Sequence, residues 1–99
     1  MKYEVIVARD AQAQFGRLDG RWRSRLKKEM RRHLEAQPKR ESKSRIKRLR
    51  GLRQPQYRMR VADMRVFYDV NEEAHRVEVL GFVDKSNTPE WLNIHGVPE

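Results

Sequence analysis

Apolar and polar residues alternate along two stretches of the chain, Lys2 to Val7 and Gln56 to Val61, and this period of two is typical of β-strands that bury one face. Two further strands are predicted after the second stretch, at Arg65 to Val70 and Arg76 to Val83. Within the second stretch, Tyr57, Met59 and Val61 share one face, and Arg58 and Arg60 share the other. The pattern therefore predicts strands that turn an apolar face toward a core, and one strand whose outward face carries arginine.

Between the first and second strands the apolar period changes to that of α-helices. A first helix is predicted after Asp10, its expected N-cap, from the helical spacing of Ala11, Phe15 and Leu18. A second helix carries a longer apolar stripe, made of Trp22, Leu26, Met30, His33 and Leu34. Pro38 is expected to end this helix, because proline interrupts helical hydrogen bonding.

The predicted order of elements is β-α-α-β-β-β with a short C-terminal helix, within a single domain that spans residues 1–99. The terminal helix is expected to begin at Thr88 and Pro89, since proline at the first helical position loses no hydrogen bond. This order defines an α+β fold in which an antiparallel sheet packs on the two N-terminal helices. The other face of the sheet, with Arg58 and Arg60, is then free to contact a ligand.

Positive charge is concentrated in the middle of the chain. The formal net charge is +9, and residues 39–65 hold eleven Lys or Arg against only Glu41 and Asp63. A local excess of this size raises the surface potential and favours a polyanionic partner. The alternative interpretation is a solvated charged surface, which is the common fate of charge runs.

Several kinds of chemistry are excluded by what the sequence lacks. It has no cysteine, which rules out disulfides, zinc–thiolate sites and cysteine nucleophiles and fits a reducing cytoplasm as the expected location. No stretch approaches the roughly 18 apolar residues that a membrane span needs, so no membrane partner is expected. Walker, GxGxxG, HExxH and GxSxG motifs are missing. His33, His75 and His95 lack the spacing of metal ligands, and we expect neither a metal nor a cofactor.

The stretches "RIKRLRGLRQPQYRMRVADMRVFYDV" and "VEVLGFVDKSNTPEWL" resemble the core of the RelE/ParE superfamily of bacterial type II toxins. The shared pattern is a Leu-Arg-Gly step, a Tyr-led strand with alternating basic residues, a hairpin into an Arg-x-x-Tyr strand, and a basic–aromatic C-terminal segment. The motifs match from Ile46 to Leu92, and the order of elements matches over essentially the whole chain. The resemblance implies the α+β toxin fold and favours the RelE-like branch.

RelE-like toxins cleave mRNA on the ribosome, and the resemblance implies attack by a ribose 2′-hydroxyl on the adjacent phosphate without a metal ion. The catalytic positions that it implies are Arg58, Arg60, Arg65, Lys85 and Trp91. The basic segment before them supplies candidate RNA contacts at Arg45, Lys47, Arg48, Arg50 and Arg53. Arginine stays protonated and is a poor general base, and tryptophan lacks a phenolic proton. Lys85 is therefore the leading candidate for proton transfer, with Tyr68 and His95 as further candidates, and Arg65 is expected to face solvent.

Two other functions stay open at this stage. One is a ParE-like toxin that inhibits DNA gyrase by binding, which needs no catalytic residue. The other is a non-catalytic protein of the same fold that binds RNA or represses its own operon. The partners that the resemblance implies are a cognate acidic antitoxin in a toxin–antitoxin hetero-oligomer, together with the ribosome and mRNA.

Overall fold

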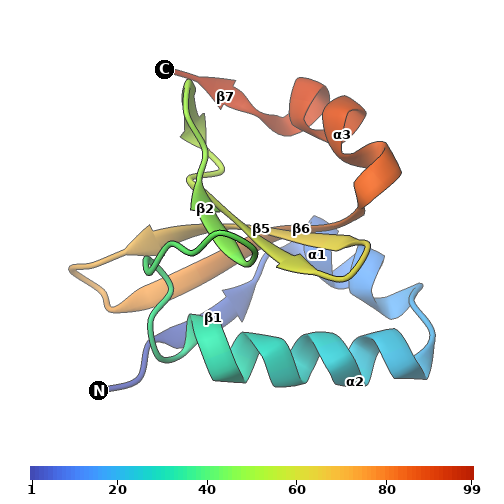
Figure 1. Cartoon of the computed structure of the whole chain (residues 1–99), viewed down its shortest axis with the longest axis horizontal. Coiled ribbons are helices and arrows are strands. Elements are labelled where there is room, and N and C mark those ends of the chain that lie inside the picture. The colour runs from blue at the N-terminus through green and yellow to red at the C-terminus, as the bar shows by residue number, and fades with distance from the viewer.

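The computed structural model describes the whole chain, residues 1–99, as an α+β fold of helices packed on a mostly antiparallel sheet (Figure 1). The strands are β1 (Glu4–Val7), β2 (Ile46–Arg48), β3 (Leu52–Gln54), β4 (Tyr57–Val61), β5 (Met64–Asn71), β6 (Arg76–Asp84) and β7 (Val97–Pro98). The helical segments are α1 (Arg9–Gly16), α2 (Gly20–Glu29), the π-helical turn η1 (Met30–Leu34), the 3-10 turn η2 (Lys85–Asn87) and α3 (Thr88–His95). The predicted fold class is confirmed.

The main sheet has five strands in the order β1-β6-β5-β4-β2. β4, β5 and β6 form the predicted antiparallel meander, whereas β1 runs parallel to β6. The short strands β2 and β3, both in the basic segment, were not predicted. β2 extends the main sheet beside β4, and β3 pairs with β7 in a separate two-stranded ribbon.

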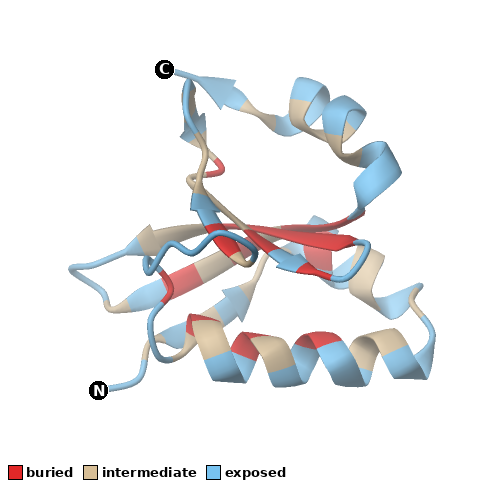
Figure 2. Cartoon of the chain, viewed as in Figure 1, coloured by how far each residue is buried: buried red, intermediate tan, exposed pale blue.

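The hydrophobic core lies between α1, α2 and one face of the sheet, as the buried positions in Figure 2 show. Leu26, Met30 and Leu34 of the predicted stripe are buried against strand residues that include Val66 and Val77. The alternation in β4 is also confirmed, because Met59 and Val61 are buried in this core while Arg60 is exposed. The helices therefore leave the opposite, outer face of the sheet uncovered over β4.

The start of the first helix differs from its prediction. α1 begins at Arg9, with Ala8 at the N-cap position, and Asp10 lies inside the first turn. The predicted cap is wrong because the chain passes directly from β1 into the helix. Ala8 still donates its N–H to the carbonyl of Val79 on β6, and the helix begins at the next residue. A side-chain cap occurs instead at α2, where Asp19 accepts a hydrogen bond of 3.0 Å from the backbone N–H of Trp22. None of the helices has the length and apolar character required to cross a membrane.

Candidate nucleic-acid interface

The β4–β5 hairpin brings three arginines together on the outer face of the sheet. Arg60 on β4 lies directly opposite Arg65 on β5, and Arg58 lies opposite Phe67 one step along. Side chains alternate between the two faces of a strand, so all three point away from the helices. We call Arg58, Arg60 and Arg65 the arginine cluster.

The arginine cluster is electrostatically unfavourable without an anion. Burial lowers the pKa of Arg58, and the charges of Arg60 and Arg65 lower it further. Burial and the charge of Arg60 likewise lower the pKa of Arg65, and Asp63 offsets this only in part. All ion pairs of the protein involve other residues. A phosphate between these guanidinium groups would relieve their repulsion, because opposite charges stabilise one another strongly where water is partly excluded.

The expectation that Arg65 faces solvent is wrong. The residue is only 7% exposed, and one guanidinium nitrogen, Nη1, donates to the carbonyls of Ala62 at 2.9 Å and Met64 at 3.1 Å. The side chain thus folds back over the hairpin turn, where Ala62 adopts a positive φ of 53°. Arg65 braces the turn, and its remaining N–H groups are the ones available to a ligand.

The helix α3 forms a wall beside the arginine cluster through Trp91. The indole stacks on Phe67 with ring centroids 4.8 Å apart, and the tilted ring of His95 lies 4.9 Å from it. Gly81 lies under the indole so closely that an added Cβ would come within 2.5 Å of Cζ2. Trp91 therefore fastens α3 to the outer face, and the ring face against Phe67 is not free to stack on a base.

The three candidates for proton transfer occupy very different surroundings. Lys85 is exposed at the start of η2, and its backbone N–H donates to the carbonyl of Asp63 at 2.7 Å, next to the hairpin. Tyr68 is fully buried on the helix side, where its hydroxyl donates to the carbonyl of Pro38 at 2.6 Å and burial raises its pKa. Tyr68 is thereby removed from the outer face, whereas His95 lies on α3 beside Trp91.

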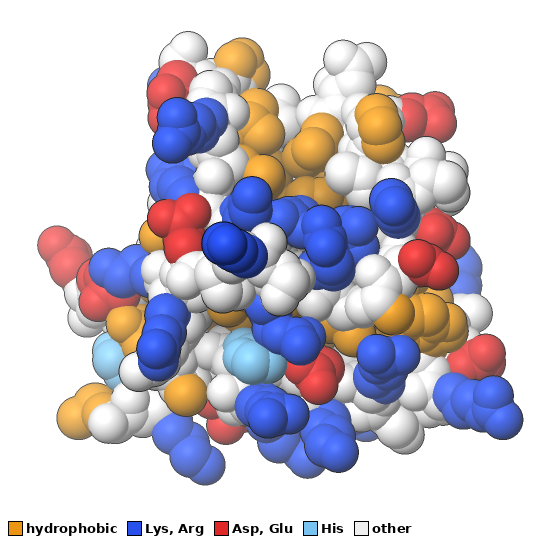
Figure 3. All heavy atoms as spheres, viewed as in Figure 1, with side chains coloured by type: hydrophobic (Ala, Val, Ile, Leu, Met, Phe, Trp, Pro, Cys, Tyr) orange, Lys and Arg blue, Asp and Glu red, His pale blue; other side chains and the backbone are white.

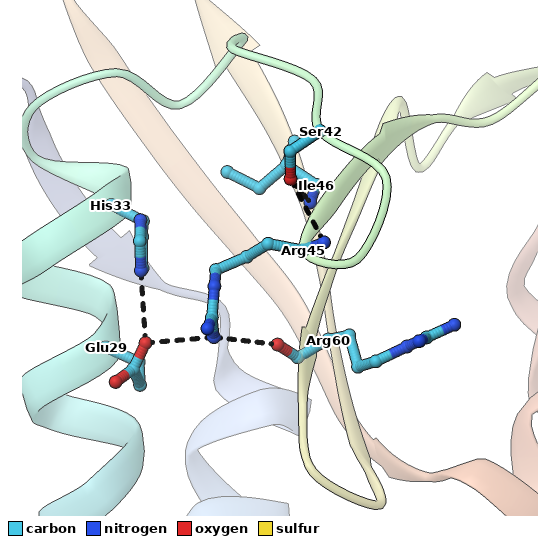
Figure 4. A network of polar contacts seen from close by, with 6 residues as sticks. All are labelled: Glu29, His33, Ser42, Arg45, Ile46 and Arg60. Carbon is cyan, nitrogen blue, oxygen red and sulfur yellow. Dashed lines mark hydrogen bonds and ion pairs between the residues drawn. The ribbon is translucent and has the colours of Figure 1, made fainter.

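Two of the five candidate RNA contacts are engaged within the protein. Figure 4 shows Arg45 between α2 and β4, where its Nη1 contacts Glu29 at 3.1 Å and donates to the carbonyl of Arg60 at 3.3 Å. Arg48 donates to the carbonyls of Leu49 and Gln56, and its guanidinium lies over the ring of Tyr57. These contacts fix the edge of the sheet next to the arginine cluster.

The other three candidates, Lys47, Arg50 and Arg53, are exposed. Lys47 on β2 lies opposite Arg58 on β4, so it continues the positive surface toward the edge of the sheet. In Figure 3, Lys and Arg side chains gather in a band across the middle of the molecule, beneath a hollow whose floor is apolar. The arrangement offers both cations for phosphates and an apolar surface for bases.

Two residues that position the site were not identified from the sequence. Glu29 binds Arg45 from α2, and Gly81 allows Trp91 to approach the sheet. Glu29 did carry a signal, because it is the single acidic residue in a basic helix. Gly81 interrupts an apolar strand, and an isolated glycine in a strand often marks close approach of another element.

Solved structures similar to this chain include a RelE toxin and RelE–RelB complexes. The chain has a TM-score of 0.69 and 27% identity to the archaeal RelE of a RelE–RelB complex from Pyrococcus horikoshii, covering 86% of this chain and 97% of that one. The toxin–antitoxin complex RelBE2 of Mycobacterium tuberculosis has a TM-score of 0.67 and 21% identity, and the match covers 85% of this chain and 99% of that one. The isolated RelE toxin of E. coli has a TM-score of 0.66 and 21% identity, and the match covers 93% of this chain and 98% of that one. No family model and no curated protein sequence matches. The chain has the RelE/ParE-like toxin fold.

Proposed function

We propose that this protein is the toxin of a toxin–antitoxin system and that it cleaves mRNA on the ribosome. The observation that carries this proposal is the arginine cluster, in which three guanidinium groups without carboxylate partners face one side of the β4–β5 hairpin. Similarity to RelE toxins over 85% or more of the chain supports the same conclusion.

In this proposal Arg58 and Arg60 hold the phosphate at which the RNA is cut. The ribose 2′-hydroxyl gives up its proton and attacks the adjacent phosphorus, while the bond from phosphorus to the 5′-oxygen breaks. The products are a 2′,3′-cyclic phosphate and a 5′-hydroxyl, whose oxygen takes up a proton as it leaves. The guanidinium groups offset the negative charge that grows on the phosphorane oxygens. The free N–H groups of Arg65 add to this stabilisation from the hairpin. Lys85, at the same end of the sheet, is the candidate for proton transfer, because arginines remain protonated.

The proposed natural inhibitor is an acidic antitoxin. The first structural neighbour is a RelE–RelB complex, and residues 39–65 of this chain carry an excess of positive charge that a flexible acidic segment could wrap. Co-expression with the adjacent open reading frame should relieve toxicity and yield a co-purifying complex. A failure of both results would contradict the proposed partner.

A second candidate function is inhibition of DNA gyrase by binding alone. It is favoured by the shortage of proton-transfer groups, since Tyr68 is buried away from the outer face and the arginines cannot act as bases. Such a toxin would use the same positive surface without chemistry. It would leave mRNA intact on the ribosome.

The purified protein should be incubated with ribosomes programmed with a defined mRNA, and separately with gyrase and relaxed plasmid. We expect cleavage of the mRNA in the ribosomal A site and normal supercoiling. The Arg58→Ala and Arg60→Ala variants should cut about 10²–10³-fold more slowly. Arg25→Ala, which removes an exposed charge on α2, is the matched control and should cut at the wild-type rate. Intact mRNA together with blocked supercoiling would replace the proposal by the gyrase function.

A further inference from the structure

A second basic site lies outside the arginine cluster. It is a pocket of about 340 Å³ between the end of the α2–η1 helix and the loop that leads to β2. Its polar lining includes Arg32, Gln37, Arg40, Ser42, Ser44 and Arg45. The side chain of Arg60 points away from this network in Figure 4, so the pocket and the arginine cluster are separate sites.

The pocket is rich in hydrogen-bond donors and has no carboxylate in its lining. Arg40 uses one nitrogen for Gln37 at 2.9 Å, and Arg45 uses one nitrogen for Glu29 and the carbonyl of Arg60. The hydroxyl oxygen of Ser42 accepts the backbone N–H of Arg45 at 3.1 Å, which leaves the hydroxyl proton to be donated. Arg32, Arg40 and Ser42 are exposed, so their remaining N–H and O–H groups are accessible to a ligand.

The acceptor that fits these donors best is a phosphate group. Guanidinium forks bind two phosphate oxygens at once, and three arginines and two serines line this pocket. The pocket lies at the C-terminal end of a helix, whose dipole opposes an anion. This opposition grows with the charge of the ligand, so the contacts of several guanidinium groups must outweigh it.

The pKa of His33 responds to the charge in this pocket. The histidine lines the same pocket, and burial and then the charge of Arg45 lower its pKa despite the opposing effect of Glu29. Its Nε2 lies 3.1 Å from Glu29 but makes no well-aligned hydrogen bond. A dianion in the pocket would favour the protonated imidazole and raise this pKa.

We propose that the basic pocket binds a phosphate group, held by Arg32, Arg40 and Arg45 with the hydroxyl of Ser42. The phosphate would belong either to the terminus of an RNA strand or to a free nucleotide. This binding site is independent of the proposed cleavage activity, because it uses none of the three arginines of the cluster.

The test measures binding of three probes by calorimetry at constant ionic strength: ATP, a short RNA with a 5′-phosphate, and the same RNA with a 5′-hydroxyl. We expect the Arg32→Ala and Arg40→Ala variants each to bind the preferred phosphate probe about tenfold or more weakly, because each removes a charge-assisted contact. Arg25→Ala, which removes an equal charge on α2 outside the pocket, should bind as the wild type does. Preference for ATP identifies a free nucleotide as the source, and preference for the 5′-phosphorylated RNA identifies a strand terminus.

The histidine signal provides an independent readout by NMR. Titration with the preferred probe should raise the pKa of His33 in the wild type and leave it unchanged in the Arg32→Ala/Arg40→Ala double variant. Equal loss of affinity in the Arg25→Ala variant, or a His33 pKa that does not respond to any probe, would overturn the proposal. Neither result depends on whether the protein cleaves mRNA, so the two proposals can fail separately.

Discussion

Replacement of Arg65 tests whether this side chain braces the hairpin that carries the arginine cluster. In Arg65→Ala, the carbonyls of Ala62 and Met64 lose donors at 2.9 and 3.1 Å. Hydrogen bonds from charged donors contribute about 1.5–3 kcal/mol each, but the Ala62 end of the turn is exposed and can be rehydrated. Relief of repulsion from Arg60 offsets a further part. We therefore expect a net loss of about 1–3 kcal/mol in the free energy of unfolding.

The loss is measurable by thermal unfolding followed by circular dichroism, with about 4–8 °C expected for each kcal/mol in a domain of this size. Arg60→Ala is the matched control, because that residue is exposed and its side chain makes no hydrogen bond. It should change the stability by no more than about 0.5 kcal/mol. Arg65→Lys keeps the charge but cannot reproduce the planar fork, so it should also melt early. An Arg65→Ala protein that melts with the wild type would refute the bracing role.

The same variant separates stability from chemistry when cleavage is measured below its melting temperature. Single-turnover cleavage at saturating ribosome should fall about 10²–10³-fold in Arg65→Ala, because a charge-stabilising group is lost. Cleavage at the wild-type rate by the folded variant would remove Arg65 from the mechanism and leave it a purely structural residue.

Three further predictions concern residues around the two sites. Lys85→Ala should slow single-turnover cleavage more than it weakens ribosome binding, and Lys85→Arg should restore binding but not the rate of cleavage. If Lys85→Ala lowers the cleavage rate and the affinity by the same factor, proton transfer by Lys85 is excluded. Gly81→Ala should force Trp91 outward, since the new Cβ would meet its ring at 2.5 Å. We expect a change in tryptophan fluorescence and a loss of about 1–3 kcal/mol in the free energy of unfolding. An unchanged emission spectrum would contradict the close packing. Arg45→Gln should raise the pKa of His33 in an NMR titration, because the charge of Arg45 lowers it; a fall would contradict the assigned cause. In the wild type, the lowered pKa of His33 stabilises the fold above the ordinary histidine pKa of about 6.5, and acidification through the folded value removes that stabilisation.

Much of the fold was predictable because local patterns and tertiary packing agree. The alternation of Tyr57, Met59 and Val61 with Arg58 and Arg60 predicted β4 and its two faces, and the structure buries Met59 and Val61 as expected. The hairpin after Val61 and the start of α3 at its proline were also predicted correctly. The short strand β2 was not predicted, because three residues are too few to show a period.

The sequence by itself determined the fold class, the antiparallel meander and the placement of Arg58 and Arg60 on one outward face, because each depends on a period or on a charge that local residues carry. The tertiary structure alone decided that Arg65 is buried against its own hairpin turn and that Arg45 is bound to Glu29. It alone gathered Arg32, Arg40 and Arg45 around one pocket. Such contacts depend on where distant backbone groups come to lie, and no spacing along the chain encodes that distance.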